Sequence, residues 1–225
     1  ASIGLGIRVR LLAEGPDVSA AQVVRDVVVG DYTDHDTLLD FARDCDVITF
    51  DHEHVPTHLL DAVLAAGVAV RPGPEALVNA QDKAVMRHRM GEIGAPNPVF
   101  EVVADAAALV AFGDRVGWPV IAKISRGGYD GKGVWKLDSA AGAGVPFAAL
   151  AESASTVDGG TISREGVRVI AEEFVPFVRE LSALVVRSPS GQGVAYPISE
   201  TVQTGGICTE TVTPAPGMTD EQQAG

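Results

Sequence analysis

The chain has 225 residues, of which 46% are hydrophobic and 21% charged, and its formal net charge is −13. This composition indicates an ordinary globular chain of one or two domains and excludes a disordered one. The acidic balance argues against nucleic-acid binding, which gains affinity from the neutralisation of phosphates. No apolar run approaches the roughly 20 residues that span a bilayer, so no membrane partner is expected.

The cysteines and the two ends bear on compartment and completeness. Cys45 and Cys208 lie far apart and form no C-x-x-C motif, which favours a reducing, cytoplasmic setting. The first residue is not Met, and Thr219-Asp-Glu-Gln222 has the form of a capping box at which a helix begins. We therefore expect a fragment of a longer protein, with natural processing as the alternative.

The first third of the chain alternates β-favouring runs with amphipathic helical runs. Strands are predicted at residues 7–12, 27–29, 47–50 and 68–70, and helices at residues 33–42 and 56–66. In the second helix the inward side chains are expected to be Leu59, Leu60, Val63 and Leu64. Alternation at these lengths favours a doubly wound parallel sheet.

The rest of the chain also divides into short elements. Helices are predicted within residues 74–94, where Asp82 caps the second of two, and at residues 106–116 and 146–152. Residues 95–98 have the composition of a linker. Strands are predicted at residues 99–103, 119–124, 134–137, 167–175, 179–187 and 193–198, the last two as a hairpin.

A glycine-rich loop is predicted between the runs 119–124 and 134–137. It contains Gly127, Gly128, Gly131 and Gly133. Glycine lets backbone N–H groups turn toward an anion, and Lys123 and Lys132 add positive charge, so the loop is expected to fold over phosphates. It is neither a Walker A motif nor a Rossmann fingerprint, because a strand follows it. A mobile hairpin without a ligand is the alternative.

The complete string AKISRGGYDGKGVW resembles the phosphate loop of one ATP-grasp family, the 5-(carboxyamino)imidazole ribonucleotide synthetases of purine biosynthesis, whose pattern is K-x-x-R-G-G-Y-D-G-[RK]-G. AQDKAVMRHRMGEIGAPNP is similar to that family's A-Q-D-[RK] helix, and YPISETVQTGGI to its Y-P-x-x-E-N-x-H-x-x-G-I segment. TFDHEHV is similar to T-x-E-x-E-x-V, with Asp51 in place of the usual glutamate. The resemblance covers nearly the whole chain.

The resemblance implies an α/β protein with the ATP-grasp fold. A Rossmann-like domain without its first strand is expected over residues 1–79, and connecting helices over residues 80–117. A lid subdomain with the glycine loop is expected over residues 118–178, and the truncated start of the C-terminal ATP-grasp subdomain over residues 179–225.

The resemblance also implies the roles of individual residues. Lys123 and Asp130 are the expected catalytic residues, and Tyr129 and Asp130 are expected to face the second substrate. ATP is expected to contact Lys83, Lys123, Gly128, Tyr129, Asp130, Gly131, Lys132, Gly133, Glu172, Glu173, Phe174, Val175, Glu180 and Gln203. Within this set, residues 172–175 would line the adenine and Glu180 would accept the ribose hydroxyls. Ordinary strand-end charges are the alternative for Glu172 and Glu173.

Metal ligands are expected outside this sequence. The resemblance implies Mg²⁺, with its ligands beyond Gly225. Residues 1–225 alone are therefore expected to have low catalytic activity. His52 and His54 flank Glu53 and raise the alternative of a zinc site, but a third ligand is not obvious nearby, and a polar strand-end loop is favoured. Gln203 stands where many family members have a histidine, and it cannot titrate.

The implied reaction joins bicarbonate to the amine of 5-aminoimidazole ribonucleotide and splits ATP into ADP and phosphate, with carboxyphosphate as the intermediate. Family members are commonly homodimers. Two alternatives stay open. One is another ATP-grasp carboxylate–amine ligase, such as a formate-using glycinamide ribonucleotide transformylase. The other is a non-catalytic nucleotide-binding module of the same fold.

Overall fold

The computed structural model describes residues 2–128, 131–152, 167–219 and 221–222. The chain divides into two compact units, and each is described by itself. The first takes in Ala1–Asn97 and, from later in the chain, Ser125–Gly127; the second begins with Pro98–Ile124 and continues with Gly128–Glu152 and Arg168–Gly225. Within the described ranges, no helix is long and apolar enough to cross a membrane.

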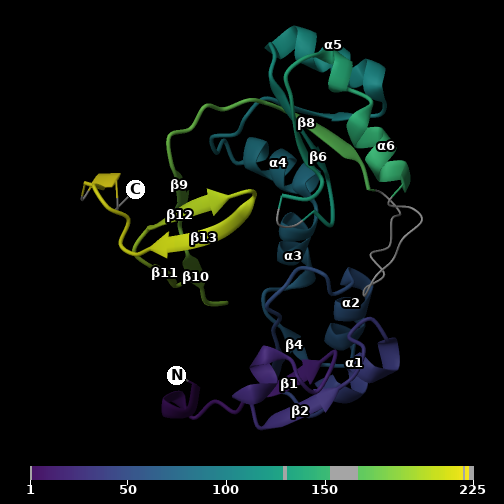
Figure 1. Cartoon of the computed structure of the whole chain (residues 1–225). Coiled ribbons are helices and arrows are strands. Elements are labelled where there is room, and N and C mark those ends of the chain that lie inside the picture. Colours follow the sequence, from purple (N-terminus) through teal and green to yellow (C-terminus); the bar gives the residue numbers. More distant parts are fainter. Residues whose placement is uncertain (1, 129–130, 153–166, 220, 223–225) are drawn as a thin grey trace. The chain divides into compact units, whose positions relative to one another are not determined.

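The first unit alternates strands and helices as the sequence predicts (Figure 1). Its strands are β1 (Arg10–Ala13), β2 (Asp26–Val29), β3 (Val47–Ile48) and β4 (Ala69–Val70), its α-helices α1 (His35–Ala42), α2 (Thr57–Ala65), α3 (Pro74–Gln81) and α4 (Lys83–Glu92), and its 3-10 helices Ser2–Leu5 and Ser19–Gln22.

The strands of the first unit pair in parallel, which confirms the predicted direction. β1 pairs with β2 and β3 with β4, so the described strands form two separate two-stranded sheets and not the one continuous sheet that we predicted. The alternation of strands and helices in a sequence determines strand direction, but it does not determine which strand edges meet. Side chains from both pairs pack on one core, including Leu12, Val28, Ile48 and Val70.

The face of α2 was predicted correctly at three of four positions. Leu59, Leu60 and Val63 are buried in the core, whereas Leu64 is 38% exposed. Each helical residue is rotated by about 100° from the one before it, so Leu64 follows Val63 around the helix and leaves the buried stripe. The prediction for Leu64 was therefore wrong.

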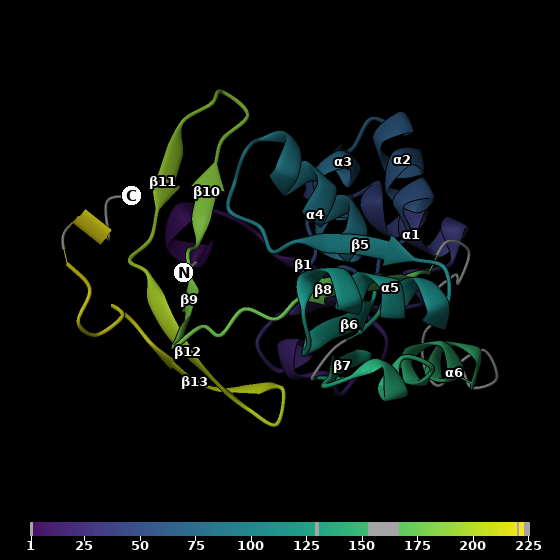
Figure 2. The same cartoon turned by 90° about the horizontal axis from the view of Figure 1, so that it is seen from above.

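The second unit contains a four-stranded antiparallel sheet in the order β5-β8-β6-β7 (Figure 2). Its strands are β5 (Phe100–Val103), β6 (Val120–Ile124), β7 (Val134–Leu137) and β8 (Val169–Glu173), and the helices packed against it are α5 (Ala106–Val116) and α6 (Val145–Glu152), with a 3-10 helix at Ala140–Gly142. The hairpin β6–loop–β7 confirms the predicted strand, glycine loop and strand.

One face of this sheet is closed by α5 and α6. Val120 and Ala122 of β6 and Ala171 of β8 pack with Leu109 and Phe112 of α5 in a single core. Alternate strand residues point to opposite faces, so the residues between these positions lie on the other face. The apolar packing therefore leaves one face of the sheet for other chemistry.

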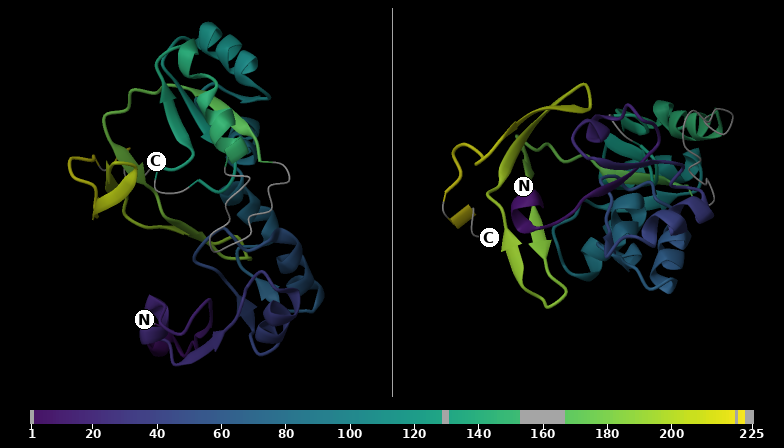
Figure 3. Two further views of the ribbon diagram at one scale, coloured as in Figure 1. Left: turned by 45° about the vertical axis from the view of Figure 1, so that its right-hand side comes forward. Right: turned by 90° about the horizontal axis from the view of Figure 1, so that it is seen from below.

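The remaining strands form a hairpin and a three-stranded sheet (Figure 3). They are β9 (Glu180–Ser182), β10 (Val185–Arg187), β11 (Gly193–Ala195), β12 (Ser199–Thr204) and β13 (Ile207–Val212). The predicted single strand over residues 179–187 is wrong: it divides into β9, which pairs with β12, and β10, which pairs with β11. Strand propensity is local, whereas the choice of partner is not.

The β12–β13 hairpin was not predicted, although the sequence carries a signal for it. Gly205 and Gly206 connect the two strands with φ values of 61° and 86°. A Gly-Gly pair between alternating β-favouring residues is typical of a two-residue hairpin turn that needs positive φ at both positions. Beyond the hairpin, the predicted capping box is confirmed: the Thr219 N–H donates to Gln222 Oε1 at 3.0 Å, and the Gln222 N–H donates to Thr219 Oγ1 at 3.3 Å.

Candidate nucleotide-binding site

Lys123 and Glu172 form an ion pair on the open side of the four-stranded sheet. Lys123 stands opposite Ile170, and Glu172 opposite Ile121, in the β6–β8 register, so both point away from the α5 and α6 core. Lys123 Nζ lies 2.7 Å from Glu172 Oε2, and the two side chains are 22% and 5% exposed. A buried carboxylate thus holds the lysine in place, and part of the lysine side chain still reaches the surface.

The open face, which we define as Ile121, Lys123, Val134, Lys136, Ile170 and Glu172, combines two cations with apolar side chains. Lys136 of β7 stands opposite Ile121, and its Nζ lies 4.8 Å from the centroid of the Phe174 ring. This contact is a cation–π interaction. Sequence reasoning missed Lys136, although alternation along β7 places it on the same side as Val134, which stands opposite Lys123.

The predicted adenine-lining residues 172–175 differ in their surroundings. Glu172 lies on the open face, whereas Glu173 points the other way, and its Oε1 accepts the Val99 N–H at 2.9 Å. Phe174 and Val175 follow the strand end and are partly exposed. Glu173 is therefore tied to the segment before β5, Glu172 is buried in its ion pair, and Phe174 and Val175 are the exposed members of the four.

The described part of the glycine loop is built on close backbone approaches. The Ile124 N–H donates to the Gly133 carbonyl at 2.9 Å and closes the hairpin. A Cβ at Gly128 would stand 2.6 Å from the Lys132 carbonyl oxygen, and one at Gly131 would stand 3.2 Å from Gly206 Cα. The backbone at Gly128 is therefore too close to a carbonyl for a larger residue, and Gly131 combines a tight approach with a φ of 75° that favours glycine.

Two predicted residues cannot be placed. Tyr129 and Asp130 lie outside the described residues, so their roles toward the second substrate and the phosphates stay predictions. Lys132, next in the loop, is exposed.

The loop begins on the first unit, where sequence reasoning missed an anchor. Arg126 Nε lies 2.9 Å from Asp82 Oδ2, and the Lys83 N–H donates to the Ser125 carbonyl at 2.8 Å. Burial by itself would raise the pKa of the Asp82 carboxyl, but Arg126 and the N–H groups of Val85 and Ala84 outweigh it and hold this pKa below its ordinary value. Asp82 was predicted as a helix cap, and its second role had no local signal.

Lys83 is the first residue of α4, as the motif predicts. It belongs to the first unit, and Lys123 belongs to the second, so the structure does not place these two lysines relative to each other.

Glu180 and Gln203 both belong to the three-stranded sheet. Glu180 stands opposite Thr201 of β12, whereas Gln203 lies beyond a register shift between Val202 and Gln203 and stands opposite Cys208 of β13. On the face away from Glu180, Arg179 pairs with Glu200 at 2.8 Å and donates to the Pro216 carbonyl at 3.0 Å. The two residues predicted to contact ATP in this sheet are thus separated by an irregularity in its strand pairing.

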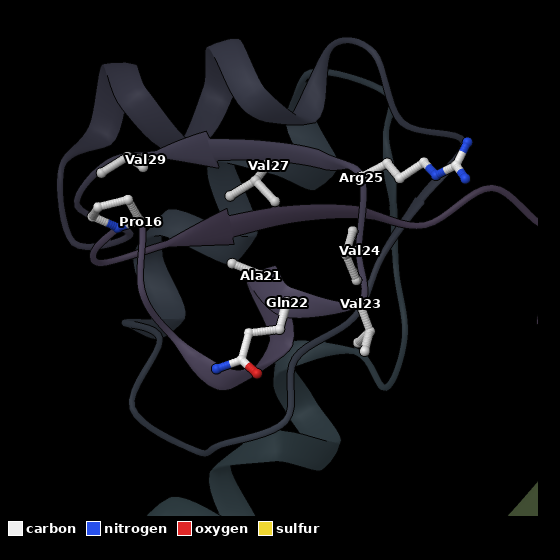
Figure 4. Close-up of a pocket in the computed structure, with 8 residues that line it drawn as sticks. All are labelled: Pro16, Ala21, Gln22, Val23, Val24, Arg25, Val27 and Val29. Atoms are coloured by element: carbon white, nitrogen blue, oxygen red, sulfur yellow. The ribbon is translucent and has the colours of Figure 1, made fainter.

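The hollow beside β1 and β2 is not a comparable site. It measures about 590 Å³ and is lined by Pro16, Ala21, Gln22, Val23, Val24, Arg25, Val27 and Val29 (Figure 4). Figure 4 shows valine, alanine and proline side chains along most of its wall, with Arg25 directed away at one end. Ligand pockets bring several polar groups together, and this hollow does not do so among its lining residues.

The alternative metal site at His52 and His54 is not supported by the local geometry. The His54 N–H donates to His52 Nδ1 at 3.1 Å, which occupies one of the ring nitrogens that a metal would need. More widely, the described residues contain no group of three or more His, Cys, Asp or Glu side chains that could hold a metal ion. They do not fit a magnesium site either, so no catalytic step is assigned to that ion.

A lysine held by a carboxylate lies on the antiparallel sheet whose hairpin carries the glycine-rich loop, in a protein of the α/β class. The chain belongs to the ATP-grasp family: the ATP-grasp domain matches residues 88–225. The ribonucleotide synthetase preATP-grasp domain matches residues 1–81. These matches and the observed elements establish the predicted ATP-grasp fold.

Individual relatives narrow the comparison. The N5-carboxyaminoimidazole ribonucleotide synthase of Corynebacterium ammoniagenes is 46% identical over 99% of this chain and 51% of its own length. The crystal structure of the N5-carboxyaminoimidazole ribonucleotide synthetase from Thermus thermophilus matches with a TM-score of 0.81 and 30% identity, over 99% of this chain and 56% of that one. The carboxyaminoimidazole ribonucleotide synthase from Aspergillus clavatus, complexed with ATP, matches with a TM-score of 0.81 and 27% identity, over 99% and 55%. The chain spans about half the length of these relatives.

Proposed function

We propose that the protein is an ATP-dependent ligase that carboxylates 5-aminoimidazole ribonucleotide with bicarbonate, in purine biosynthesis. The observation that carries this proposal is the 46% identity over 99% of the chain to a relative named for that product. The Lys123–Glu172 pair beside the glycine loop supports the ATP half of the reaction.

The proposed chemistry has two steps. A bicarbonate oxygen attacks the γ-phosphorus of ATP, the bond to the bridging oxygen breaks, and ADP leaves with formation of carboxyphosphate. The ribonucleotide amine then attacks the carboxyl carbon, phosphate leaves, and the amine nitrogen loses one proton. Charge on the phosphoryl oxygens must be neutralised in the first step, and positioned cations provide this neutralisation.

The open face supplies what the ATP half of this reaction needs. Lys123 presents an ammonium group for a phosphate, and the ion pair with Glu172 fixes the orientation of the lysine side chain. Ile121 and Phe174 offer apolar surface for a planar base. In the three-stranded sheet, Glu180 would accept the ribose hydroxyls, and Gln203 would contribute a further polar group to the nucleotide.

Tyr129 and Asp130 are proposed to contact the ribonucleotide, with Asp130 orienting its amine, and Gly128, Gly131, Lys132 and Gly133 to cover the phosphates. Lys83 is proposed as a further cation near the nucleotide. We also propose Mg²⁺ as a requirement, a homodimer as the assembly and the cytoplasm as the compartment. The division at residues 79, 117 and 178 remains our proposal for the domain limits.

The test is ADP release by the full-length protein with ATP, magnesium and bicarbonate, with and without 5-aminoimidazole ribonucleotide. Release that depends on the ribonucleotide is expected, together with its loss in Lys123→Met. Release that depends instead on formate and glycinamide ribonucleotide would show the other ligase. ATP binding without release under either condition would show a non-catalytic module.

A further inference from the structure

Asp82 and Ser125 are buried polar residues of the first unit, and each bonds across the junction between the start of α4 and the start of the glycine loop. Asp82 is 2% exposed and Ser125 fully buried. Both oxygens of the Asp82 carboxylate are used. Oδ1 accepts the N–H groups of Ala84 at 2.9 Å and Val85 at 3.3 Å, and Oδ2 pairs with Arg126 Nε at 2.9 Å. One buried carboxylate thus joins the first turn of α4 to the loop.

The backbone adds a second connection at the same place. The Lys83 N–H donates to the Ser125 carbonyl at 2.8 Å, and the N–H of Asp82, the cap residue itself, donates to the Val78 carbonyl at 3.0 Å. All four N–H groups that a helix leaves open in its first turn are therefore engaged within the protein. The start of α4 serves as an attachment point for the loop and is not free to bind an anion.

The anchor matters because glycine-rich segments have many accessible backbone conformations. Gly127 and Gly128 follow Arg126 directly, and Gly127 has a φ of 77°. A loop of this kind loses conformational entropy when it is ordered so that its N–H groups contact a phosphate. A fixed starting point reduces this loss of entropy on binding. Lys123, near the end of the preceding strand, lies only three residues before Arg126.

We propose that Asp82 is a positioning residue for the glycine loop, which holds Arg126 and thereby sets the backbone path of residues 125–128 toward the nucleotide phosphates. The proposal rests on the proposed function in that the ligand is ATP. Asp82 itself touches no ligand in this assignment, and Arg126 acts through its ion pair and not as a phosphate ligand.

The test uses two variants that break the ion pair from opposite sides in the full-length protein. Asp82→Ser keeps a helix cap, because serine caps about as well as aspartate, but it cannot reach Arg126. Arg126→Gln leaves the cap intact and removes the charge. Asp105→Ser is the matched control, because Asp105 caps α5 through the Ala108 N–H at 2.8 Å in the same way.

The readouts are the dissociation constant for ATP and the hydrogen exchange of the amides of residues 125–128 without nucleotide. We expect each single variant to raise the dissociation constant about 10- to 100-fold, since misplacing a positioning group by about 1 Å can cost this much. The double variant should bind within about twofold of the weaker single one, because both changes break one interaction. Exchange at residues 125–128 should quicken in both, and Asp105→Ser should change neither readout.

Two results would overturn the proposal. If Arg126→Gln weakens ATP binding while Asp82→Ser does not, then Arg126 contacts the phosphates itself. If exchange at residues 125–128 is unchanged in both variants, the ion pair does not order the loop. Neither readout requires turnover. An absence of ribonucleotide-dependent ADP release would therefore count against the proposed function only, and ATP binding and hydrogen exchange would still decide the positioning role of Asp82.

Discussion

The two faces of the β5-β8-β6-β7 sheet are made by the same strands but differ in composition: one is packed with apolar side chains, and the other carries charged ones. One face is closed by α5 and α6, with Val120, Ala122 and Phe112 fully buried in an apolar core. The other carries the Lys123–Glu172 pair and Lys136. Neighbouring residues of a strand point to opposite faces, so one residue contributes to the apolar core and the next to the face that carries the charged groups. Changes on one face should therefore affect stability alone, and changes on the other should affect binding as well.

The largest effect is expected for Phe112→Ala on the closed face. Phe112 is fully buried, and truncation of a buried phenylalanine costs about 3–5 kcal/mol of unfolding free energy. Urea unfolding measures this loss, with Val134→Ala on the open face as the control that should cost far less. A loss below about 1 kcal/mol for Phe112→Ala would show that this face is not the core.

Lys123→Met should affect both properties. Removal of one partner from a buried ion pair costs about 3 kcal/mol, because Glu172 is left as an uncompensated charge. Loss of a cation at the phosphates should also lower ADP release by the full-length protein about 100- to 1,000-fold.

The double variant Lys123→Met with Glu172→Leu separates the two effects. It removes the stranded carboxylate and should recover most of the stability, but it should not recover turnover. Recovery of turnover along with stability would show that Lys123 has only a structural role.

Asp82→Asn extends the comparison to the buried carboxylate of the first unit. The variant keeps the helix cap but loses the charged hydrogen bond to Arg126, which should cost about 2 kcal/mol at neutral pH. Because the pKa of Asp82 is held below its ordinary value of 3.8, the stabilisation is complete above that value and is lost as pH falls through the lower pKa of the folded protein. The stability difference between the two proteins should therefore be constant from pH 7 down to about pH 4 and begin to shrink as the pH falls below 3.8. A stability difference that does not shrink with acid would contradict the assignment.

Lys136→Met should give the smallest effect. The substitution keeps a long side chain over the Phe174 ring but removes the charge, and exposed cation–π pairs contribute about 0.5–1 kcal/mol. Lys136 also lies 3.8 Å from Asp138, so Asp138→Asn serves as the control for that surface pair. An equal loss in both variants would assign the effect to the ion pair.

The local pattern of the sequence was enough for most elements and for the family. Hydrophobic periodicity and capping residues predicted the α-helices α1 to α6 and the strands β1 to β8 and β11, since both signals act within one or two helical turns or a few strand residues. The string around Gly127–Gly133 indicated the ATP-grasp family, because a long run of rare residues is specific. The cap at Asp82 and the capping box at Thr219 were also correct for this reason.

Only the tertiary structure decided which groups meet. Lys123 and Glu172 are 49 residues apart in sequence, and Asp82 and Arg126 are 44 apart. The division of residues 179–187 between two sheets likewise depends on partners further along the chain. A sequence pattern reports the preferences of one segment, whereas ion pairs and strand ladders form between segments that folding brings together. The sequence alone therefore determined the elements, the family and the glycine loop. The open face and the anchor at Asp82 became apparent only once the strands had paired.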